Sequence, residues 1–287
     1  LAKPNPRRHT SSRLPQRERT ILITGISRSG TSYLCSLIDT HSNAVGLNET
    51  PELVSALKGP LTPWSLPQYL RCVRSDILDG KPVRNKVKDG RVISDTAEDD
   101  RFGTYQPSVD THEFVIAAKN TFAFLSSLER LRQVMPRARY VICVRNPVDT
   151  IASWKASFAH LRLADLTIRP VGGPDDPNLS PRRREALSEI EVTQNLAVRR
   201  AKLWRYLAER ISEDRVHGHI LVRYEDLEAD PAAALAGLLD GLPAGALEEG
   251  WETPRPRNRR AHLDAEDLDA ISTICAPIAQ QLGVAFD

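Results

Sequence analysis

The chain has 287 residues, of which 41% are hydrophobic and 26% charged, so its length and composition suit a soluble globular protein with one α/β domain. Residues 1–19 carry six basic side chains and one acidic one, which leaves 33 basic and 36 acidic side chains in the rest. This balance excludes a basic nucleic-acid-binding body, and no apolar run reaches the ~18 residues of a membrane-spanning helix. We predict a flexible basic tail over 1–19 and a single domain over 20–287, with neither a nucleic acid nor a membrane as partner.

The cysteines give no sign of a metal site or of a disulfide framework. Cys35, Cys72, Cys143 and Cys275 lie far apart in the sequence and lack the spacing of metal ligands. Cys35 and Cys143 lie among apolar residues, which is typical of reduced thiols in a protein core. We therefore expect a cytoplasmic protein without a bound metal ion. The sequence leaves the oligomeric state open, and a homo-oligomer is one of the alternatives.

The first predicted elements are a buried strand at residues 21–23, a glycine-bounded loop at 25–32 (GISRSGTS) and a helix at 33–40. This order is typical of a phosphate-binding loop, because the free N–H groups and the dipole of the helix start point at the loop. Thr31 and Ser32 add hydroxyl donors at the same place. The sequence therefore predicts an anion site here.

The loop departs from a nucleotide-binding Walker A loop in one important position. Gly25 and Gly30 have the Walker spacing, but Thr31 stands where the lysine belongs. The Walker lysine reaches the β- and γ-phosphates and works beside Mg²⁺. The cation of this loop is instead Arg28, next to Ser29. We therefore predict an anionic ligand that needs no Mg²⁺.

Strands and helices alternate through the rest of the chain. Further strands are predicted at 113–118, 140–144 and 220–224, and helices at 51–57, 68–79, 122–134, 147–160, 182–212, 231–240 and 264–282. Residues 80–112 are polar and charged and are predicted to be a binding loop or a disordered insertion. The alternation predicts a three-layer α/β fold with a central parallel sheet flanked by helices, with ligands at the carboxyl ends of the strands.

Three cationic or aromatic side chains follow the predicted strands. Lys119, Arg145 and Tyr224 each stand at or just beyond a strand end. Ser153 lies two helical turns after Arg145, so the two side chains are placed to converge on one phosphate, which arginine binds bidentately. A basic loop that contains Arg257 and Arg259 precedes the last helix.

The loop at 25–32, followed by Asp39-Thr-His41 and by Glu49-Thr50, resembles the 5′-phosphosulfate loop region of sulfotransferases that use 3′-phosphoadenosine 5′-phosphosulfate (PAPS). The form with arginine in the loop is most similar to the tyrosylprotein sulfotransferase branch. The Tyr-Glu-Asp-Leu stretch that begins at Tyr224 resembles that of bacterial sulfotransferases. The resemblance implies a P-loop NTPase-like fold and PAPS as co-substrate, without a metal.

The resemblance also implies roles for individual residues. Glu49 corresponds to the general base for the acceptor hydroxyl, and Lys119 to the lysine that reaches the bridging oxygen of the leaving group. The residues that correspond to the donor-binding site are Arg28, Ser29, Gly30, Thr31 and Ser32 for the 5′-phosphosulfate, Arg145 and Ser153 for the 3′-phosphate, Tyr224 for the adenine end, and Arg257 and Arg259 for the closing loop. Arg28 is also expected to contact the transferred sulfuryl group.

The sequence leaves the acceptor and two alternative functions open. Residues 52–112 differ from the tyrosylprotein branch, which favours a bacterial enzyme acting on a hydroxyl of a small metabolite or sugar. A P-loop kinase using Mg·ATP is the first alternative, and Thr31 in the lysine position disfavours it. A non-catalytic nucleotide-binding module is the second, and it predicts that Glu49→Ala has no effect.

Overall fold

A five-stranded parallel sheet forms the centre of the protein in a computed structural model that describes residues 20–58, 64–169, 171–239 and 260–284. Its strands are β1 (Thr20–Gly25), β2 (Ala44–Asn48), β6 (Val115–Lys119), β7 (Arg139–Val144) and β8 (Ile220–Arg223). They lie in the order β2-β6-β1-β7-β8, and every neighbouring pair is parallel. This confirms the predicted α/β fold. The predicted tail at 1–19 lies outside the described residues.

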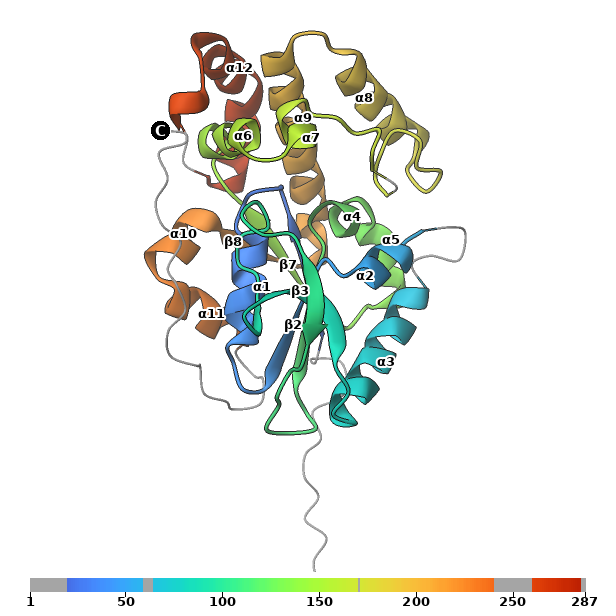
Figure 1. Ribbon diagram of the computed structural model, residues 1–287. Coiled ribbons are helices and arrows are strands. Elements are labelled where there is room, and N and C mark those ends of the chain that lie inside the picture. Colours follow the sequence, from blue (N-terminus) through green and yellow to red (C-terminus); the bar gives the residue numbers. More distant parts are fainter. Residues whose placement is uncertain (1–19, 59–63, 170, 240–259, 285–287) are drawn as a thin grey trace, which may run out of the picture.

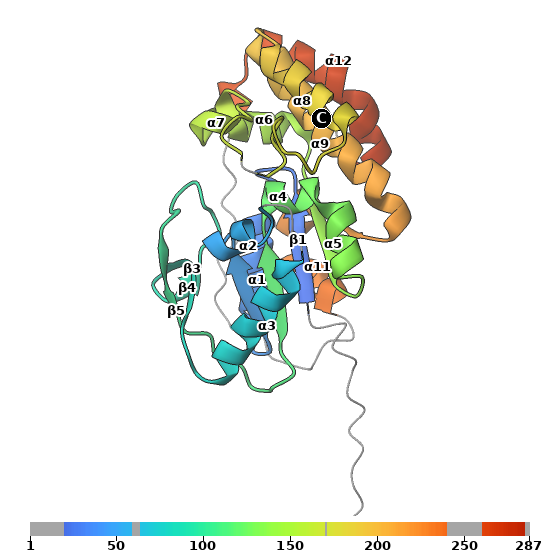
Figure 2. The same ribbon diagram turned by 90° about the vertical axis from the view of Figure 1, so that its right-hand side faces the viewer.

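Helices cover both faces of this sheet (Figures 1 and 2). One side holds α1 (Thr31–Asp39), α10 (Tyr224–Ala229) and α11 (Pro231–Leu239), and the other holds α2 (Pro51–Ser55), α3 (Ser65–Leu78), α4 (Thr121–Ser126) and α5 (Leu128–Val134). Burial on both faces explains why the strands read as continuous apolar runs. Ile21, Leu22 and Ile23 of β1 are at most 1% exposed.

Three helices that were predicted as continuous are each divided in two. The segment 122–134 divides into α4 and α5 at Ser127, whose φ of −108° and ψ of 9° leave the helical range. The segment 147–160 forms α6 (Pro147–Ala156) and α7 (Ala159–Arg162), and 182–212 forms α8 (Pro181–Val192) and α9 (Leu196–Asp214). Asn195 starts α9 afresh, because its side chain accepts a hydrogen bond from the Val198 N–H at 3.0 Å. The apolar periodicity continues across these breaks and conceals them.

Residues 80–112 correct the prediction of an irregular insertion, because they contain an antiparallel sheet of β3 (Val83–Lys88), β4 (Arg91–Val92) and β5 (Phe102–Tyr105). Asp89 and Gly90 connect the first two strands with φ of 51° and 78°, as a type I′ hairpin turn requires. Asn85 fastens this sheet to β2: it accepts a hydrogen bond from the Asn48 N–H at 2.8 Å and donates one to the Gly46 carbonyl at 2.7 Å. The small sheet thus lies beside the edge strand of the large one (Figure 2).

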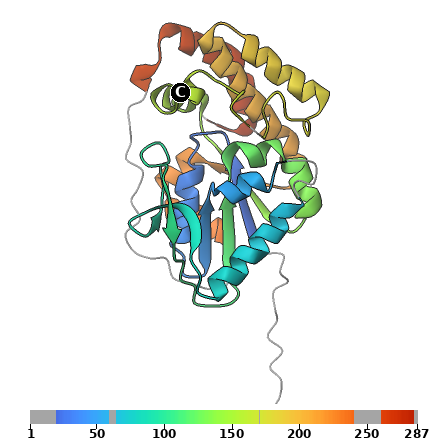
Figure 3. The same ribbon diagram turned by 45° about the vertical axis from the view of Figure 1, so that its right-hand side comes forward.

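A group of helices stands over the carboxyl ends of the parallel strands: α6, α7, α8, α9 and α12 (Ala265–Leu282) (Figures 1 and 3). Asp267 of α12 ties three of them together, because its carboxylate pairs with Arg200 of α9 at 2.6 Å and with Lys155 of α6. Asp267 is 1% exposed and Arg200 5%. These ion pairs hold α6, α9 and α12 together above the carboxyl ends of the strands.

Replacing Asp267 with Ala is expected to lower the free energy of unfolding by about 3–5 kcal/mol, because it leaves the buried Arg200 without its carboxylate, whereas the partly exposed Lys155 keeps Asp264. The substitution also removes one half of the capping box at the start of α12. Urea denaturation followed by tryptophan fluorescence measures the change, with Asp269→Ala on the exposed face of the same helix as the control. Equal losses in the two variants would contradict this role for Asp267.

Candidate active site

A cavity of about 890 Å³ opens between the carboxyl ends of the strands and the overlying helices, a size typical of ligand pockets, which span about 300–1,000 Å³. Nine of the predicted site residues line it together: Arg28, Gly30, Thr31, Ser32, Glu49, Lys119, Arg145, Ser153 and Tyr224. Ser29 is fully buried and does not line the cavity. Arg257 and Arg259 lie outside the described residues.

The loop after β1 brings Arg28 against α6. Arg28 has a φ of 73°, an uncommon value for a residue with a side chain. Its Nε donates a hydrogen bond to Ser153 Oγ at 3.2 Å, and its guanidinium pairs with Asp95 at 2.8 Å. Gly30, which caps α1 with a φ of 82°, leaves no room for a side chain, because a Cβ would lie 2.6 Å from Tyr224 Cδ2. The loop is therefore in direct contact with Ser153, which is predicted to bind the 3′-phosphate, and with Tyr224, which is predicted to contact the adenine end.

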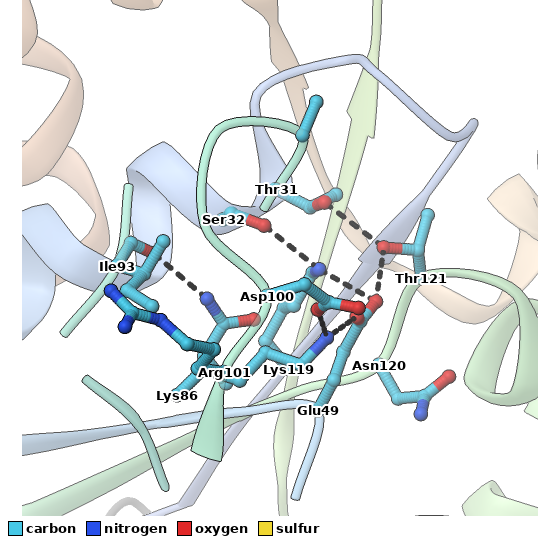
Figure 4. Close-up of polar contacts among 12 residues, drawn as sticks. Thr31, Ser32, Glu49, Lys86, Ile93, Asp100, Arg101, Lys119, Asn120 and Thr121 are labelled. Atoms are coloured by element: carbon cyan, nitrogen blue, oxygen red, sulfur yellow. Dashed lines mark hydrogen bonds and ion pairs between the residues drawn. The ribbon is translucent and has the colours of Figure 1, made fainter. Parts of the chain in front are cut away.

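Glu49 is the centre of a cluster of polar side chains (Figure 4). It follows β2 with a φ of 50°, another backbone value of the kind that concentrates at functional sites. Its Oε1 accepts hydrogen bonds from Lys119 Nζ at 2.7 Å and from Thr121 Oγ1 at 3.2 Å, and its Oε2 accepts one from Lys86 Nζ at 3.0 Å. Lys119 Nζ also donates to Ser32 Oγ at 2.9 Å, so it joins the carboxylate to the phosphate loop.

The charges in this cluster determine the protonation state of Glu49. Burial by itself would raise the pKa of the carboxyl group, but the ammonium groups of Lys119 and Lys86 outweigh burial and hold the pKa well below its ordinary value. Glu49 is therefore an ionised carboxylate throughout the physiological pH range. An ionised carboxylate in a ligand cavity is chemically able to accept a proton from a bound hydroxyl group.

Arg145 and Tyr224 pack on each other in the wall of the cavity. The guanidinium carbon of Arg145 lies 4.1 Å from the centroid of the Tyr224 ring, and among the described residues its buried Nε has no hydrogen-bond partner. Asn146 caps α6 by accepting a hydrogen bond from the Asp149 N–H at 2.8 Å, and Pro147 begins the helix as predicted. The cap directs α6 so that Arg145 and Ser153 line the same cavity.

A family model described as the sulfotransferase family matches residues 20–244. The chain belongs to the sulfotransferase family. No curated protein matches it.

Solved structures similar to this sulfotransferase cover nearly all of its chain. The sulfotransferase domain from the curacin biosynthetic pathway is 16% identical over 96% of this chain and 100% of its own, with a TM-score of 0.48. A sulfotransferase from Alicyclobacillus acidocaldarius is 17% identical over 94% of this chain and 97% of its own, with a TM-score of 0.45. A sulfotransferase from Mycobacterium avium is 14% identical over 94% and 78%, with a TM-score of 0.45.

The family match confirms the resemblance to sulfotransferases at the level of the family. It does not separate the tyrosylprotein branch from the others, so similarity to that branch stays a prediction.

Within the described residues, no helix has both the length and the apolar character needed to cross a membrane. Over the same ranges, no group of three or more His, Cys, Asp or Glu side chains is arranged to hold a metal ion. The four cysteines are free; Cys35, Cys143 and Cys275 are buried, whereas Cys72 is exposed and not in the core.

Lys86 is one of the site residues of this sulfotransferase that were not predicted from the sequence. It comes from β3, is 6% exposed, and pairs with both Glu49 and Asp100. The signal was present: Asp89-Gly90 between two alternating runs is a strong hairpin indicator. A hairpin prediction would have put Val83, Asn85 and Val87 on one face, but it would still not have placed Lys86 beside Glu49.

Proposed function

We propose that this sulfotransferase transfers a sulfuryl group from PAPS to a hydroxyl group of a small metabolite or sugar, with Glu49 as the general base. The observation that carries the proposal is the pair Glu49–Lys119, which is joined to the phosphate loop through Ser32 inside a cavity bordered by two arginine-bearing turns. The carboxylate is available to take a proton. The lysine is available to donate to an oxygen that gains negative charge.

The cavity suits a donor with two separated anionic groups. Arg28 and the N–H groups at the start of α1 provide one positive end, and Arg145 provides the other; Ser153 lies between them, because its hydroxyl accepts a hydrogen bond from Arg28. The buried Nε of Arg145 has no partner among the described residues, and a bound phosphate would satisfy it. Tyr224 lies between the two ends, against both Gly30 and Arg145, where an adenine or ribose group can pack on its ring.

The proposed reaction is an in-line transfer. The acceptor oxygen forms a new S–O bond while the S–O bond to the bridging oxygen of the donor breaks, and the 3′,5′-bisphosphate leaves with that electron pair. The acceptor proton passes to Glu49. Lys119 donates a hydrogen bond to the departing oxygen, and Arg28 stabilises the charge on the sulfuryl oxygens. When Lys119 donates to the leaving group, its hydrogen bond to Glu49 weakens. The pKa of Glu49 then rises, so Glu49 becomes a stronger base during the transfer step.

Replacing Lys86 with Met is expected to move the acid limb of the kcat/KM profile to higher pH. Lys86 helps to hold the pKa of Glu49 low, so the base form of Glu49 persists to low pH in the parent enzyme. Without that ammonium group the pKa rises, and activity falls as the pH drops through the new, higher value. A pH–rate profile from acidic to neutral pH measures the shift. Lys88→Met, on the exposed side of the same hairpin, is the control; an unchanged acid limb in Lys86→Met contradicts the assignment.

The proposed function is tested by incubating the enzyme with ³⁵S-labelled PAPS and a metabolite extract in the presence of EDTA. We expect labelled organic sulfate from the parent enzyme and none from Glu49→Ala. In a parallel incubation with Mg·ATP and without EDTA, transfer of phosphate to an acceptor would support the kinase. Binding of the donor without transfer to any acceptor would support the non-catalytic module, and the family match makes both outcomes unexpected.

A further inference from the structure

Arg169 is a cation in the cavity that the proposed reaction does not use. It lines the cavity with Phe122 and His160. Its guanidinium carbon lies 3.7 Å from the centroid of the Phe122 ring. Within the described ranges, its Nε is buried without a hydrogen-bond partner and its guanidinium forms no ion pair. Burying a polar N–H group without a hydrogen-bond partner costs free energy, so the side chain of Arg169 is suited to a ligand that accepts hydrogen bonds from it.

The carboxylates near Arg169 are all committed to other groups. Glu49 binds two lysines, and Glu191 pairs with an arginine of α9 at 2.9 Å. Asp165 accepts two hydrogen bonds from Thr167. Burial lowers the pKa of Arg169 to about 10, so the guanidinium remains charged at neutral pH. The guanidinium is therefore charged, and although Asp165, Glu49 and Glu191 are close enough to stabilise that charge, none of the described carboxylates forms an ion pair with it.

The segment that carries Arg169 is fixed against α4. The Arg169 N–H donates to the Leu166 carbonyl at 3.1 Å, and the Gly172 N–H donates to the buried Asp176 carboxylate at 2.7 Å. Gly172, with a φ of 80°, packs so closely that a Cβ there would lie 2.0 Å from Ser126 Oγ. This packing holds the guanidinium at a defined place in the cavity wall, as a specificity group requires.

Arg169 belongs to the Glu49 end of the cavity. It stacks on Phe122, the residue after Thr121, and Thr121 donates a hydrogen bond to Glu49 at 3.2 Å. The cations assigned to the donor, Arg28 and Arg145, contact Ser153 and Tyr224 instead. Arg169 thus lies on the side of the proposed base, and it contacts neither Arg28 nor Arg145, although Thr121 also reaches Thr31 of the donor loop at 3.1 Å.

We propose that Arg169 binds a carboxylate on the acceptor, so that the substrates of this enzyme are hydroxylated carboxylic acids. This inference rests on the proposed function. The planar guanidinium matches a carboxylate in bidentate geometry, and stacking on Phe122 leaves its donor edge available. Acidic side chains also line the cavity, and two of them, Asp95 and Asp100, each pair with a cation; Arg169 pairs with no carboxylate in the part of the chain that the structure describes.

Matched acceptors test the proposal. The phenols are 4-hydroxyphenylacetate, its amide and tyramine; the alcohols are 4-(hydroxymethyl)benzoate and its amide. Label transfer from ³⁵S-PAPS is measured for the parent enzyme, for Arg169→Gln and for Arg182→Gln, an exposed arginine of α8 that serves as the control. We expect kcat/KM for a carboxylate to exceed that for its amide by about 10- to 100-fold, the range for a hydrogen-bonded charge pair. Arg169→Gln should abolish that preference by lowering only the carboxylate rates.

Three results would overturn the inference. They are equal rates for acid and amide in the parent enzyme, a preference for the amine, and an equal loss for acid and amide in Arg169→Gln, which would assign the arginine to the donor. If none of the compounds is sulfated, saturation-transfer NMR on the complex with adenosine 3′,5′-bisphosphate measures binding of the two acids. Binding that is absent, or equal in the parent and in Arg169→Gln, also overturns it.

Failure of this inference is separable from failure of the proposed function. Titration calorimetry with adenosine 3′,5′-bisphosphate checks the donor site of each variant independently of the acceptor. If the bisphosphate binds and label is transferred without regard to the carboxylate, only the role of Arg169 is wrong. If the bisphosphate does not bind to the parent enzyme, the proposed function itself is wrong. Unchanged bisphosphate affinity in Arg169→Gln also shows that the variant is folded.

Discussion

Glu49→Gln is expected to lower the rate of sulfuryl transfer by about 10²- to 10⁴-fold, the usual contribution of a general base. The amide keeps the shape of the side chain but cannot accept the acceptor proton. It also leaves Lys119 without its carboxylate partner and Lys86 with Asp100 alone. Affinity for adenosine 3′,5′-bisphosphate should therefore stay the same or increase, because the ammonium group of Lys119 then faces the anionic ligand without a compensating carboxylate.

Single-turnover transfer from ³⁵S-PAPS measures the chemical step, and titration calorimetry measures binding. Glu185→Gln, an exposed glutamate of α8, is the matched control and should behave like the parent enzyme. A Glu49→Gln variant whose transfer rate equals that of the control would remove Glu49 from the mechanism. A variant that loses bisphosphate binding as well would assign Glu49 to the fold rather than to proton transfer.

Lys119→Met is the second substitution with a large expected effect, a loss of about 10²- to 10³-fold in kcat, as for removal of a donor to developing charge. Lys119 is 2% exposed and bridges Ser32 and Glu49, so it lies between the phosphate loop and the proposed base. Methionine occupies similar space but donates no hydrogen bond to the departing oxygen. The loss should appear in kcat and only weakly in the affinity for the bisphosphate product.

Two measurements separate this role from a structural one. Urea denaturation compares the stability of Lys119→Met with that of the parent enzyme, and kcat is measured where both are fully folded. Lys88→Met again provides the control. A fully folded Lys119→Met variant with normal kcat would contradict the proposed contact with the leaving group.

Much of the fold could be predicted because its signals are local. The strand at 21–23, the glycine-bounded loop and the strand before Arg145 are recognisable from apolar runs and turn residues alone, and the structure has them at those places. β2 was missed because Ala44–Asn48 is short and contains Gly46, whose place in the strand depends on pairing with β6. Pairing between distant segments leaves no mark in a single stretch of sequence.

The site was predictable only for residues next to such signals. Lys119 ends one predicted strand and Arg145 follows another, and parallel strands bring their carboxyl ends to one edge. Glu49 follows the missed strand β2, and only the resemblance to sulfotransferases indicated it. Lys86 and Arg169 lie next to no such signal. Lys86 is in a hairpin that was predicted to be an irregular insertion, and Arg169 is in a proline-rich segment, where an arginine is expected to be exposed. Their positions follow from long-range packing, such as that of Asn85 on β2 and of Gly172 on α4.

The central claim is that Arg28 and Arg145 hold opposite ends of one doubly anionic adenosine ligand. Titration calorimetry in EDTA, comparing adenosine 3′,5′-bisphosphate with adenosine 5′-phosphate, tests it most directly. We expect the parent enzyme to bind the bisphosphate more tightly by about 10-fold or more, as for an added charge-assisted contact, and Arg145→Met to bind the two ligands alike. Equal affinities in the parent enzyme, or a preference that survives Arg145→Met, would contradict the claim.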